Sequence, residues 1–267
     1  HYPESVIDWV VEKRFKGILE NNPHINQIHT VSLNKIKSNK SLKLLFTEVS
    51  KARKFGNYDV VIDLQGLIKS AIIAKFISSR KIVGFDKNSI REALASFFYH
   101  QKVAIGYDQN SIERYVKLTS EALRIKITKD DILNKELYLF SKSKLLIPQT
   151  PYIILVIGST WQSRNYPKEK FLQVVQDIKK SCIVVWGSEQ EKEKAKWMSS
   201  ESDYIQLMPK LSLDDLKCVI SHASLLIGND TGPSHMSWAL NIPSIILFGP
   251  TPIERAFQTP INTVLSS

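Results

Sequence analysis

The sequence predicts an α/β protein with parallel sheets that is divided into two domains. Short apolar runs alternate with stretches of helical period along the whole chain, which is the pattern of repeated strand–helix–strand units. The length of 267 residues suits two domains of roughly 100–150 residues each. The polar stretch Ser141–Thr150 lacks a clear period and contains a proline, which is typical of a linker. We therefore expect domains at residues 1–145 and 150–267.

In the first half, apolar runs such as VIDWVV and DVVID predict strands, and apolar residues spaced three and four apart predict helices. The expected strands lie at 6–11, 28–33, 59–63 and 81–84, and the expected helices at 42–55, 67–77 and 112–123. A doubly wound domain usually opens with an apolar strand and a glycine-rich turn into its first helix. Residues 1–5 (HYPES) are instead typical of the end of a helix that leads into a second strand. We expect the first strand–turn–helix unit of this domain to be missing from the sequence.

The second half follows the same alternation without interruption. The expected strands lie at 152–157, 182–186, 204–208, 225–228 and 244–248, and the expected helices at 167–179, 190–198, 213–222 and 233–240. Pro167 suits the first position of a helix. Ser212 is a favourable N-cap, with Asp215 at the third helical position. The series predicts a second parallel sheet with helices packed against it.

Composition excludes several classes of protein. With 43% hydrophobic and 23% charged residues, the chain is predicted to be globular rather than disordered. Its longest apolar runs are far shorter than the ~20 residues of a membrane-spanning helix, and it opens without the pattern of an export signal. Cys182 and Cys218 lie in apolar segments and form neither a disulfide framework nor a metal-binding spacing. These features favour a cytoplasmic protein.

The positive charge is confined to one half of the chain. Residues 1–146 carry 25 Lys and Arg against 15 Asp and Glu, whereas residues 147–267 carry 11 of each. A one-sided basic field attracts polyanions or an anionic membrane; the simpler alternative is a solvated face of an amphipathic helix. The densest run, within residues 34–54, contains one acid, Glu48, and seven cations: Lys35, Lys37, Lys40, Lys43, Lys51, Arg53 and Lys54.

Residues 224–240 (SLLIGNDTGPSHMSWAL) contain the most distinctive local pattern. An apolar strand is followed by Asp230 and Thr231, then by Gly232, which allows close approach to the backbone, and a helix follows. Free N–H groups and the positive end of the dipole at a helix N-terminus bind phosphate. His235, on the first turn, would face the same anion. The alternative is that Asp230 or Thr231 is only an N-cap and His235 an ordinary helical residue.

Two further loops follow predicted strands of the same sheet. Ser159, Thr160 and Arg164 combine hydroxyl donors with a guanidinium, a set that suits a diphosphate, although each of them fits an ordinary turn as well. The segment 186–191 (WGSEQE) places Glu191 where a carboxylate would hold a ribose hydroxyl. Because ligands of open α/β sheets bind at the carboxyl ends of the strands, the three loops together predict a nucleotide site.

The ordered set of motifs resembles glycosyltransferase family 9, the lipopolysaccharide heptosyltransferases. The matching residues are Ser159-Thr160, Arg164, Pro167, Trp186-Gly187, Glu191, Pro209-Lys210, Asp230-Thr231-Gly232, His235 and 248–251 (FGPT). In the first half, residues 7–15, 58–71 and 91–103 are similar to the branch of the family that adds the first heptose to the Kdo region of lipid A. The resemblance spans nearly the whole chain.

The resemblance implies the GT-B fold, in which two Rossmann-like domains face each other across a cleft and the C-terminal one binds the donor. It implies ADP-L-glycero-β-D-manno-heptose as the donor, inversion at the anomeric carbon, and no metal or other cofactor. The implied diphosphate ligands are Ser159, Thr160, Arg164, Thr231 and Gly232. Glu191 and Lys210 would hold the nucleoside, Asp230 the heptose hydroxyls, and His235 the same donor, with Arg164 and Asp230 closest to the chemistry. Arg164 stands where the family often has lysine.

The acceptor side is less defined. Lys35, Lys37, Lys40 and Arg114 are the predicted ligands for the phosphates and carboxylates of Kdo–lipid A. The family's general base is an aspartate in the strand–turn–helix unit that we expect to be missing, and a chain without it would bind the donor but transfer inefficiently. Asp63 ends a strand of the same domain, but a role in the turn suits it better than that of a substitute base.

Other functions stay open at this point. The chain could be heptosyltransferase II or another core transferase of the same family, or an α/β ligand-binding protein without catalysis. A nucleic-acid binder would explain the basic charge, but the basic run lacks interleaved aromatic residues. We therefore expect no nucleic-acid partner, and we place the protein in the cytoplasm, peripherally at the inner face of the inner membrane.

Overall fold

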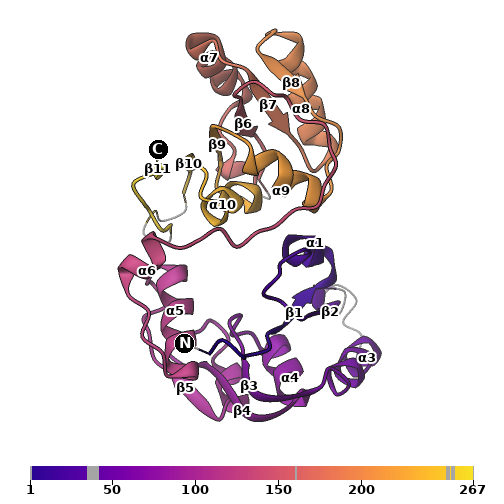
Figure 1. Cartoon of the computed structure of the whole chain (residues 1–267), viewed down its shortest axis with the longest axis vertical. Coiled ribbons are helices and arrows are strands. Elements are labelled where there is room, and N and C mark those ends of the chain that lie inside the picture. The colour runs from indigo at the N-terminus through magenta and orange to yellow at the C-terminus, as the bar shows by residue number, and fades with distance from the viewer. Residues whose placement is uncertain (1, 35–41, 160, 251–252, 254–255, 267) are drawn as a thin grey trace. The chain divides into compact units, whose positions relative to one another are not determined.

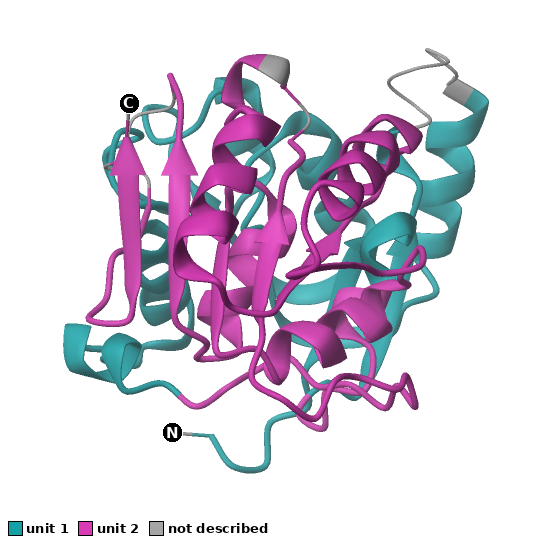
Figure 2. Ribbon diagram, turned by 90° about the horizontal axis from the view of Figure 1, so that it is seen from above, with its two compact units in different colours: residues 1–16, 25–135 teal, residues 17–24, 136–267 magenta. Residues whose placement is uncertain are grey.

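The computed structural model describes residues 2–34, 42–159, 161–250, 253 and 256–266 (Figure 1). The chain divides into two compact units, which Figure 2 shows in different colours. Unit 1 comprises residues 1–16 and 25–135, and unit 2 comprises residues 17–24 and 136–267. All paired strands run parallel. The predicted α/β class with parallel sheets is confirmed.

Unit 2 is built on a six-stranded sheet with the strand order β11-β10-β9-β6-β7-β8. The strands are β6 (Ile153–Val156), β7 (Cys182–Val185), β8 (Ile205–Leu207), β9 (Leu225–Asn229), β10 (Ser244–Phe248) and β11 (Asn262–Ser266). The helices are η3 (Gln162–Arg164), α7 (Lys168–Ile178), α8 (Glu189–Ser200), α9 (Leu213–Ser221) and α10 (Gly232–Ala239). Ser212 caps α9 together with Asp215, as predicted, whereas Pro167 is the N-cap of α7 rather than its first helical residue.

Successive side chains of each strand point to opposite faces of the sheet in unit 2, so its core is divided into two parts. Ile154 and Val156 of β6 pack with residues of α9 and α10. Leu155, between them in sequence, packs with residues of α7 and α8 on the other face. Successive side chains of a strand point to opposite faces, so a continuous apolar strand needs helices on both sides. The helices therefore leave the carboxyl edge of the sheet to the loops.

Unit 1 contains two smaller parallel sheets, β1-β2 and β3-β4-β5. The strands are β1 (Asp8–Glu12), β2 (Gln27–Val31), β3 (Asn57–Ile62), β4 (Ser78–Phe85) and β5 (Gln101–Val103). The helices are η1 (Lys13–Phe15), α1 (Lys16–Leu19), which crosses the boundary to unit 2, α3 (Leu42–Ala52), α4 (Ile68–Phe76), η2 (Ala93–Phe98), α5 (Ser111–Leu123) and α6 (Lys129–Leu133). One core joins α4, β4 and α5, and another joins β2, α3 and α4.

Helix α9 fastens the two segments that connect the units. Lys217 is fully buried, and its Nζ donates to the backbone carbonyls of Glu20 and Phe140 and pairs with Asp214 at 3.0 Å. Ser141 also donates to the carbonyl of Asp214. Because the segment after residue 135 packs on α9, it belongs to unit 2, and the boundary between the two units falls at 135/136. The linker predicted from the sequence lies further along the chain, at 141–150.

Candidate functional site

The loops after β6, β7 and β9 lie at one edge of the sheet in unit 2. These strands are parallel and adjacent in the order β9-β6-β7, so their carboxyl ends are neighbours. Open parallel sheets bind ligands at this edge. The loops carry most of the predicted donor ligands, and Lys210 follows β8 on the same edge.

Asp230, directly after β9, holds two cationic or titratable groups from different segments. Its Oδ2 lies 3.3 Å from Arg164 Nη1, and its Oδ1 lies 3.0 Å from His235 Nε2. The Asp230 side chain is 11% exposed, whereas those of Arg164 and His235 are 34% and 53% exposed. The carboxylate is therefore shielded below a guanidinium and an imidazole, whose other N–H groups can bind an anion. The structure brings these three predicted residues together.

The start of α10 lies directly beside this cluster. Thr231 is the N-cap in an extended conformation, and within the described chain its side chain makes no capping hydrogen bond. A Cβ added to Gly232 would meet no described heavy atom within 4 Å. The protein's own packing therefore does not require glycine here, but an anion approaching the backbone N–H groups at a helix N-terminus would.

Glu191 connects the loop after β7 with the loop after β6. Ser188 and Glu191 form a capping box at the start of α8, in which Glu191 Oε2 accepts from the N–H groups of Gly187 at 2.7 Å and Ser188 at 3.3 Å. A Cβ on Gly158 would stand 2.1 Å from Glu191 Oε1, so the glycine makes room for the carboxylate. Glu191 is thus a helix cap that borders the predicted donor loops.

Lys210 lies at the far side of the same edge, beside Trp186. The indole Nε1 of Trp186 donates to the carbonyl of Met208 at 2.8 Å, which fixes the ring. Lys192 and Lys210 place their ammonium groups 5.0 and 5.9 Å from the ring centre, within the range of cation–π attraction. The exposed Lys210 is therefore oriented by an aromatic surface.

Ser159 belongs to the loop after β6. Ser159 makes local hydrogen bonds with the backbone of Trp161, as a donor and as an acceptor, both at 3.2 Å. Thr160 lies outside the described residues, as do the predicted acceptor ligands Lys35, Lys37 and Lys40.

Arg114, a predicted acceptor ligand, lies in a structural environment. It is 7% exposed, and its guanidinium donates to the carbonyls of Gly106 at 2.6 Å and Ser89 at 2.5 Å. Its guanidinium carbon also lies 4.8 Å from the ring centre of Phe85 and 5.1 Å from that of Tyr107. In this structure the charge of Arg114 therefore fastens two loops to α5.

Asp63 also has a structural environment. It is 6% exposed and accepts hydrogen bonds from Tyr99 and Ser70, at 2.7 and 2.8 Å, and from the N–H groups of Gln65 and Gly66. Burial raises the pKa of this carboxyl, although its hydrogen bonds act in the opposite direction. The carboxylate organises the turn after β3, in line with the turn role preferred from the sequence.

Other kinds of site find no support in the part of the chain that the structure describes. There, no group of three or more His, Cys, Asp and Glu side chains is placed to hold a metal ion. No helix within the same ranges combines the length and the apolar character needed to cross a membrane. Both cysteines are buried free thiols, and burial raises the pKa of Cys182 to about 11.

One residue of this edge escaped the sequence analysis. Asn229, the last residue of β9, is fully buried, and both ends of its side-chain amide bond to neighbouring loops. Its only signal in the sequence is a polar residue at the end of an apolar strand, which is common before a turn.

Comparison with known sequences identifies the family. The profile of glycosyltransferase family 9 (heptosyltransferase) matches residues 47–264. Lipopolysaccharide heptosyltransferase 1 of Campylobacter coli is 38% identical over 280 residues, which cover 98% of this chain and 80% of that protein. The protein of the same name from Pseudomonas aeruginosa is 30% identical, over 93% of this chain and 71% of its own length.

Solved structures show the same fold. Heptosyltransferase WaaC of E. coli with ADP superposes with a TM-score of 0.83 at 25% identity, over 99% of this chain and 85% of that one. Its structure with ADP-2-deoxy-2-fluoro heptose gives 0.81 over 98% and 84%. The expected GT-B class is thereby confirmed. The chain belongs to glycosyltransferase family 9.

Proposed function

We propose that the protein transfers L-glycero-D-manno-heptose from ADP-heptose to the Kdo region of lipid A, in synthesis of the lipopolysaccharide core of Gram-negative bacteria. The grouping of Arg164, Asp230 and His235 beside the start of α10 carries the proposal. It is supported by relatives named lipopolysaccharide heptosyltransferase 1 and by the likeness to WaaC with a fluorinated ADP-heptose. The second candidate is heptosyltransferase II or another core transferase of the family.

The chemistry follows from the charge that develops on the leaving group. When the bond between the anomeric carbon and the diphosphate breaks, negative charge grows on the departing ADP. The guanidinium of Arg164, the imidazole of His235 and the N-terminus of α10 would stabilise that charge. Asp230 holds both side chains in place and offers its remaining lone pairs to the heptose hydroxyls. An acceptor hydroxyl attacking from the opposite face would invert the anomeric centre.

The rest of the donor would extend along the sheet edge. Ser159, Thr160, Thr231 and Gly232 would surround the diphosphate. Glu191 and Lys210 would lie at the nucleoside end, because their loops follow β7 and β8. No metal or other cofactor enters this scheme. The proton of the attacking acceptor hydroxyl would pass to a base outside this set of donor ligands.

Binding of ADP tests the donor site directly. ADP should raise the melting temperature of the protein by about one degree or more, and Arg164→Ala should abolish the increase. Arg80→Ala is the matched control, because Arg80 pairs with Asp59 at 3.1 Å on the surface of unit 1. An increase with an oligonucleotide but none with ADP would contradict the proposal. Release of ADP from ADP-heptose that requires Kdo–lipid A lacking heptose would favour the first-heptose activity over that of heptosyltransferase II.

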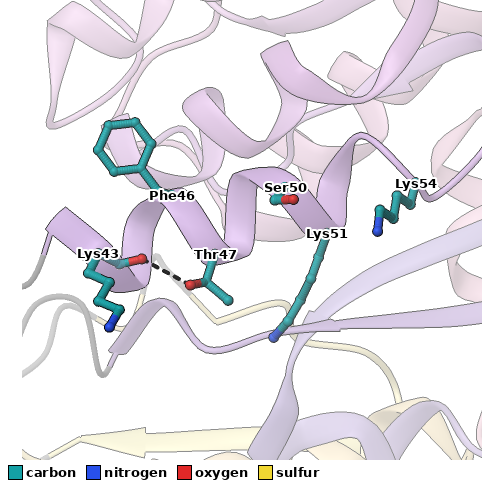
Figure 3. Close-up of a pocket in the computed structure, with 6 residues that line it drawn as sticks. All are labelled: Lys43, Phe46, Thr47, Ser50, Lys51 and Lys54. Carbon is teal, nitrogen blue, oxygen red and sulfur yellow. Dashed lines mark hydrogen bonds between the residues drawn. The ribbon is translucent and has the colours of Figure 1, made fainter.

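The acceptor is lipid-linked, and α3 offers a surface that suits an anionic membrane. Figure 3 shows the side chains along this helix, which border a groove of about 420 Å³. Phe46 is 72% exposed, and Lys43, Lys51 and Lys54 line the same groove. An exposed aromatic residue among lysines on an amphipathic helix is typical of binding at the membrane interface. This surface supports a proposed location at the cytoplasmic face of the inner membrane, and Lys35, Lys37 and Lys40 stay the predicted acceptor ligands.

Flotation with vesicles tests this placement. The protein should float with phosphatidylglycerol vesicles at low salt, sediment with pure phosphatidylcholine, and lose binding as salt rises. Replacing Phe46 by Ser and Lys43 and Lys54 by Glu should weaken flotation, while replacement of the exposed Phe97 by Ser should not. Failure to float even at low salt would remove the membrane partner and leave the donor site untouched.

A further inference from the structure

The fully buried Asn229 connects three segments of the candidate donor site. Its Oδ1 accepts from the N–H of Tyr166 at 2.9 Å, and its Nδ2 donates to the carbonyl of Ile157 at 2.9 Å. Its own carbonyl accepts from Ser234 Oγ, on α10, at 2.7 Å. One residue therefore links the end of β6, the loop that carries Arg164, and the first turn of α10.

The loop that carries Arg164 is held from both of its sides. Tyr166 is fixed by Asn229 at the backbone and by an edge-to-face contact with Phe171 of α7, with ring centres 5.2 Å apart. The backbone of Ser163 lies against the end of β10, since a Cβ on Gly249 would stand 2.9 Å from the Ser163 carbonyl oxygen. Arg164 lies between these two supports and reaches Asp230, the neighbour of Asn229, at 3.3 Å.

The position requires the chemistry of an amide. One atom must accept from an N–H and the other must donate to a carbonyl. An ionised aspartate could accept from Tyr166 but would face the Ile157 carbonyl with a second acceptor. Alanine would take away the partner of a part-buried N–H and of a buried carbonyl, which is costly.

We propose that Asn229 is a positioning residue for the donor site: it sets the loop of Arg164 and the start of α10 at the separation that a diphosphate needs. The inference rests on the proposed binding of ADP-heptose. A displacement of about 1 Å in such a site can change a rate or an affinity by ten- to a hundredfold, so the side chain acts on the ligand without touching it.

Asn262 provides a matched control within the same sheet. It is 4% exposed at the start of β11, and its amide donates to Ile242 O and Ser244 Oγ, both at 2.9 Å, and accepts from Thr259 at 2.8 Å. It has the same side chain and comparable burial and hydrogen bonding, but it lies at the amino end of the strands. Asn229→Ala and Asn262→Ala should lower the melting temperature of the ligand-free protein to a similar extent.

Titration calorimetry with ADP separates the two variants. We expect Asn229→Ala to weaken ADP binding about tenfold or more, while Asn262→Ala binds like the wild type. Hydrogen exchange at the Tyr166 amide should accelerate in Asn229→Ala only. In Asn229→Asp, the affinity relative to wild type should recover as pH falls, because a protonated carboxyl can donate to Ile157.

Two results would overturn the assignment: unchanged ADP affinity in folded Asn229→Ala, or an equal loss in Asn262→Ala. If Asn229→Ala does not fold, Asn229→Asp carries the test, and a flat pH dependence of its relative ADP affinity would contradict the assignment. A wild-type protein that does not bind ADP would refute the proposed function instead, so the two failures are distinguishable.

Discussion

At the scale of single residues, substitution of Gly232 can distinguish an effect on ligand binding from an effect on folding. A Cβ there meets no described atom, whereas a Cβ on Gly228 would lie 2.6 Å from Val156 Cβ and 2.8 Å from Ser234 Oγ. We expect Gly232→Ala to leave the free energy of unfolding within about 0.5 kcal/mol of wild type and to weaken ADP binding about tenfold or more. Gly228→Ala should destabilise the fold by about 1–3 kcal/mol. Chemical denaturation and ADP titration check both, and normal ADP affinity in Gly232→Ala would contradict a diphosphate at this helix start.

Asp8 should make the stability of unit 1 depend on pH. Burial raises the pKa of this carboxyl. Hydrogen bonds from Tyr58, Asn26 and His29, together with the charge of His29, lower the pKa by more than burial raises it, so the net shift is downward. The pKa of an aspartate in the unfolded chain is near 4. Because the pKa in the folded state is lower, the ionised carboxylate stabilises the fold at pH values above that unfolded-state pKa, and this stabilisation is lost as pH falls through the folded-state pKa. Asp8→Asn should cost about 1.5–3 kcal/mol at neutral pH. The difference from wild type should shrink in acid; urea unfolding at several pH values measures it, with the exposed Asp59→Asn as control.

Three residues of the candidate site could be predicted from the sequence because their chemistry is visible in their type. Arg164, Asp230 and His235 follow strands of one parallel sheet, and the rule for carboxyl edges predicted that they would meet. Asn229 was missed because an amide that bonds to backbone has the same appearance in a sequence as any turn residue. The burial of Arg114 could not be foreseen, since a cation on a helix is usually solvated and the carbonyls that bind it come from distant turns.

At the scale of elements, the sequence predicted those with a continuous apolar run or several turns of helical period. The strand Ser244–Phe248 was predicted with its observed bounds, and α9 differs from the prediction by one residue. Helices α1 and α6 were missed because four or five residues make little more than one helical turn. Strand β5, Gln101–Val103, was missed because it has no apolar run. Strand β11 lies at the edge of the sheet and has only two apolar residues, Val264 and Leu265. It was missed because it lacks the continuous apolar run of the buried strands.

Helix α9 depends on one buried charge. Lys217 Nζ is fully enclosed and bonds to two backbone carbonyls and Asp214. Lys217→Met would remove the buried ammonium from all three acceptors, so we expect a loss of about 3–5 kcal/mol in the free energy of unfolding of unit 2. Lys192→Met, which removes an exposed pair with Glu189, should cost less than about 1 kcal/mol. Guanidinium denaturation followed by tryptophan fluorescence compares them, and equal small losses would refute this anchoring role.

At the scale of the whole molecule, each hydrophobic core cluster lies within a single unit. All described donor-site residues belong to unit 2. A ligand stabilises only the structure that must be folded to bind it, so ADP should protect the two units unequally. At ADP concentrations about a hundred times its dissociation constant, binding adds about 2.7 kcal/mol. The slowest-exchanging amides of β6 and β9 should therefore exchange about a hundredfold more slowly, while those of β4 stay unchanged. Hydrogen exchange with mass spectrometry measures this, and Arg164→Ala should remove the effect. Equal protection of β4 would show that the units unfold together or that ADP binds unit 1 as well.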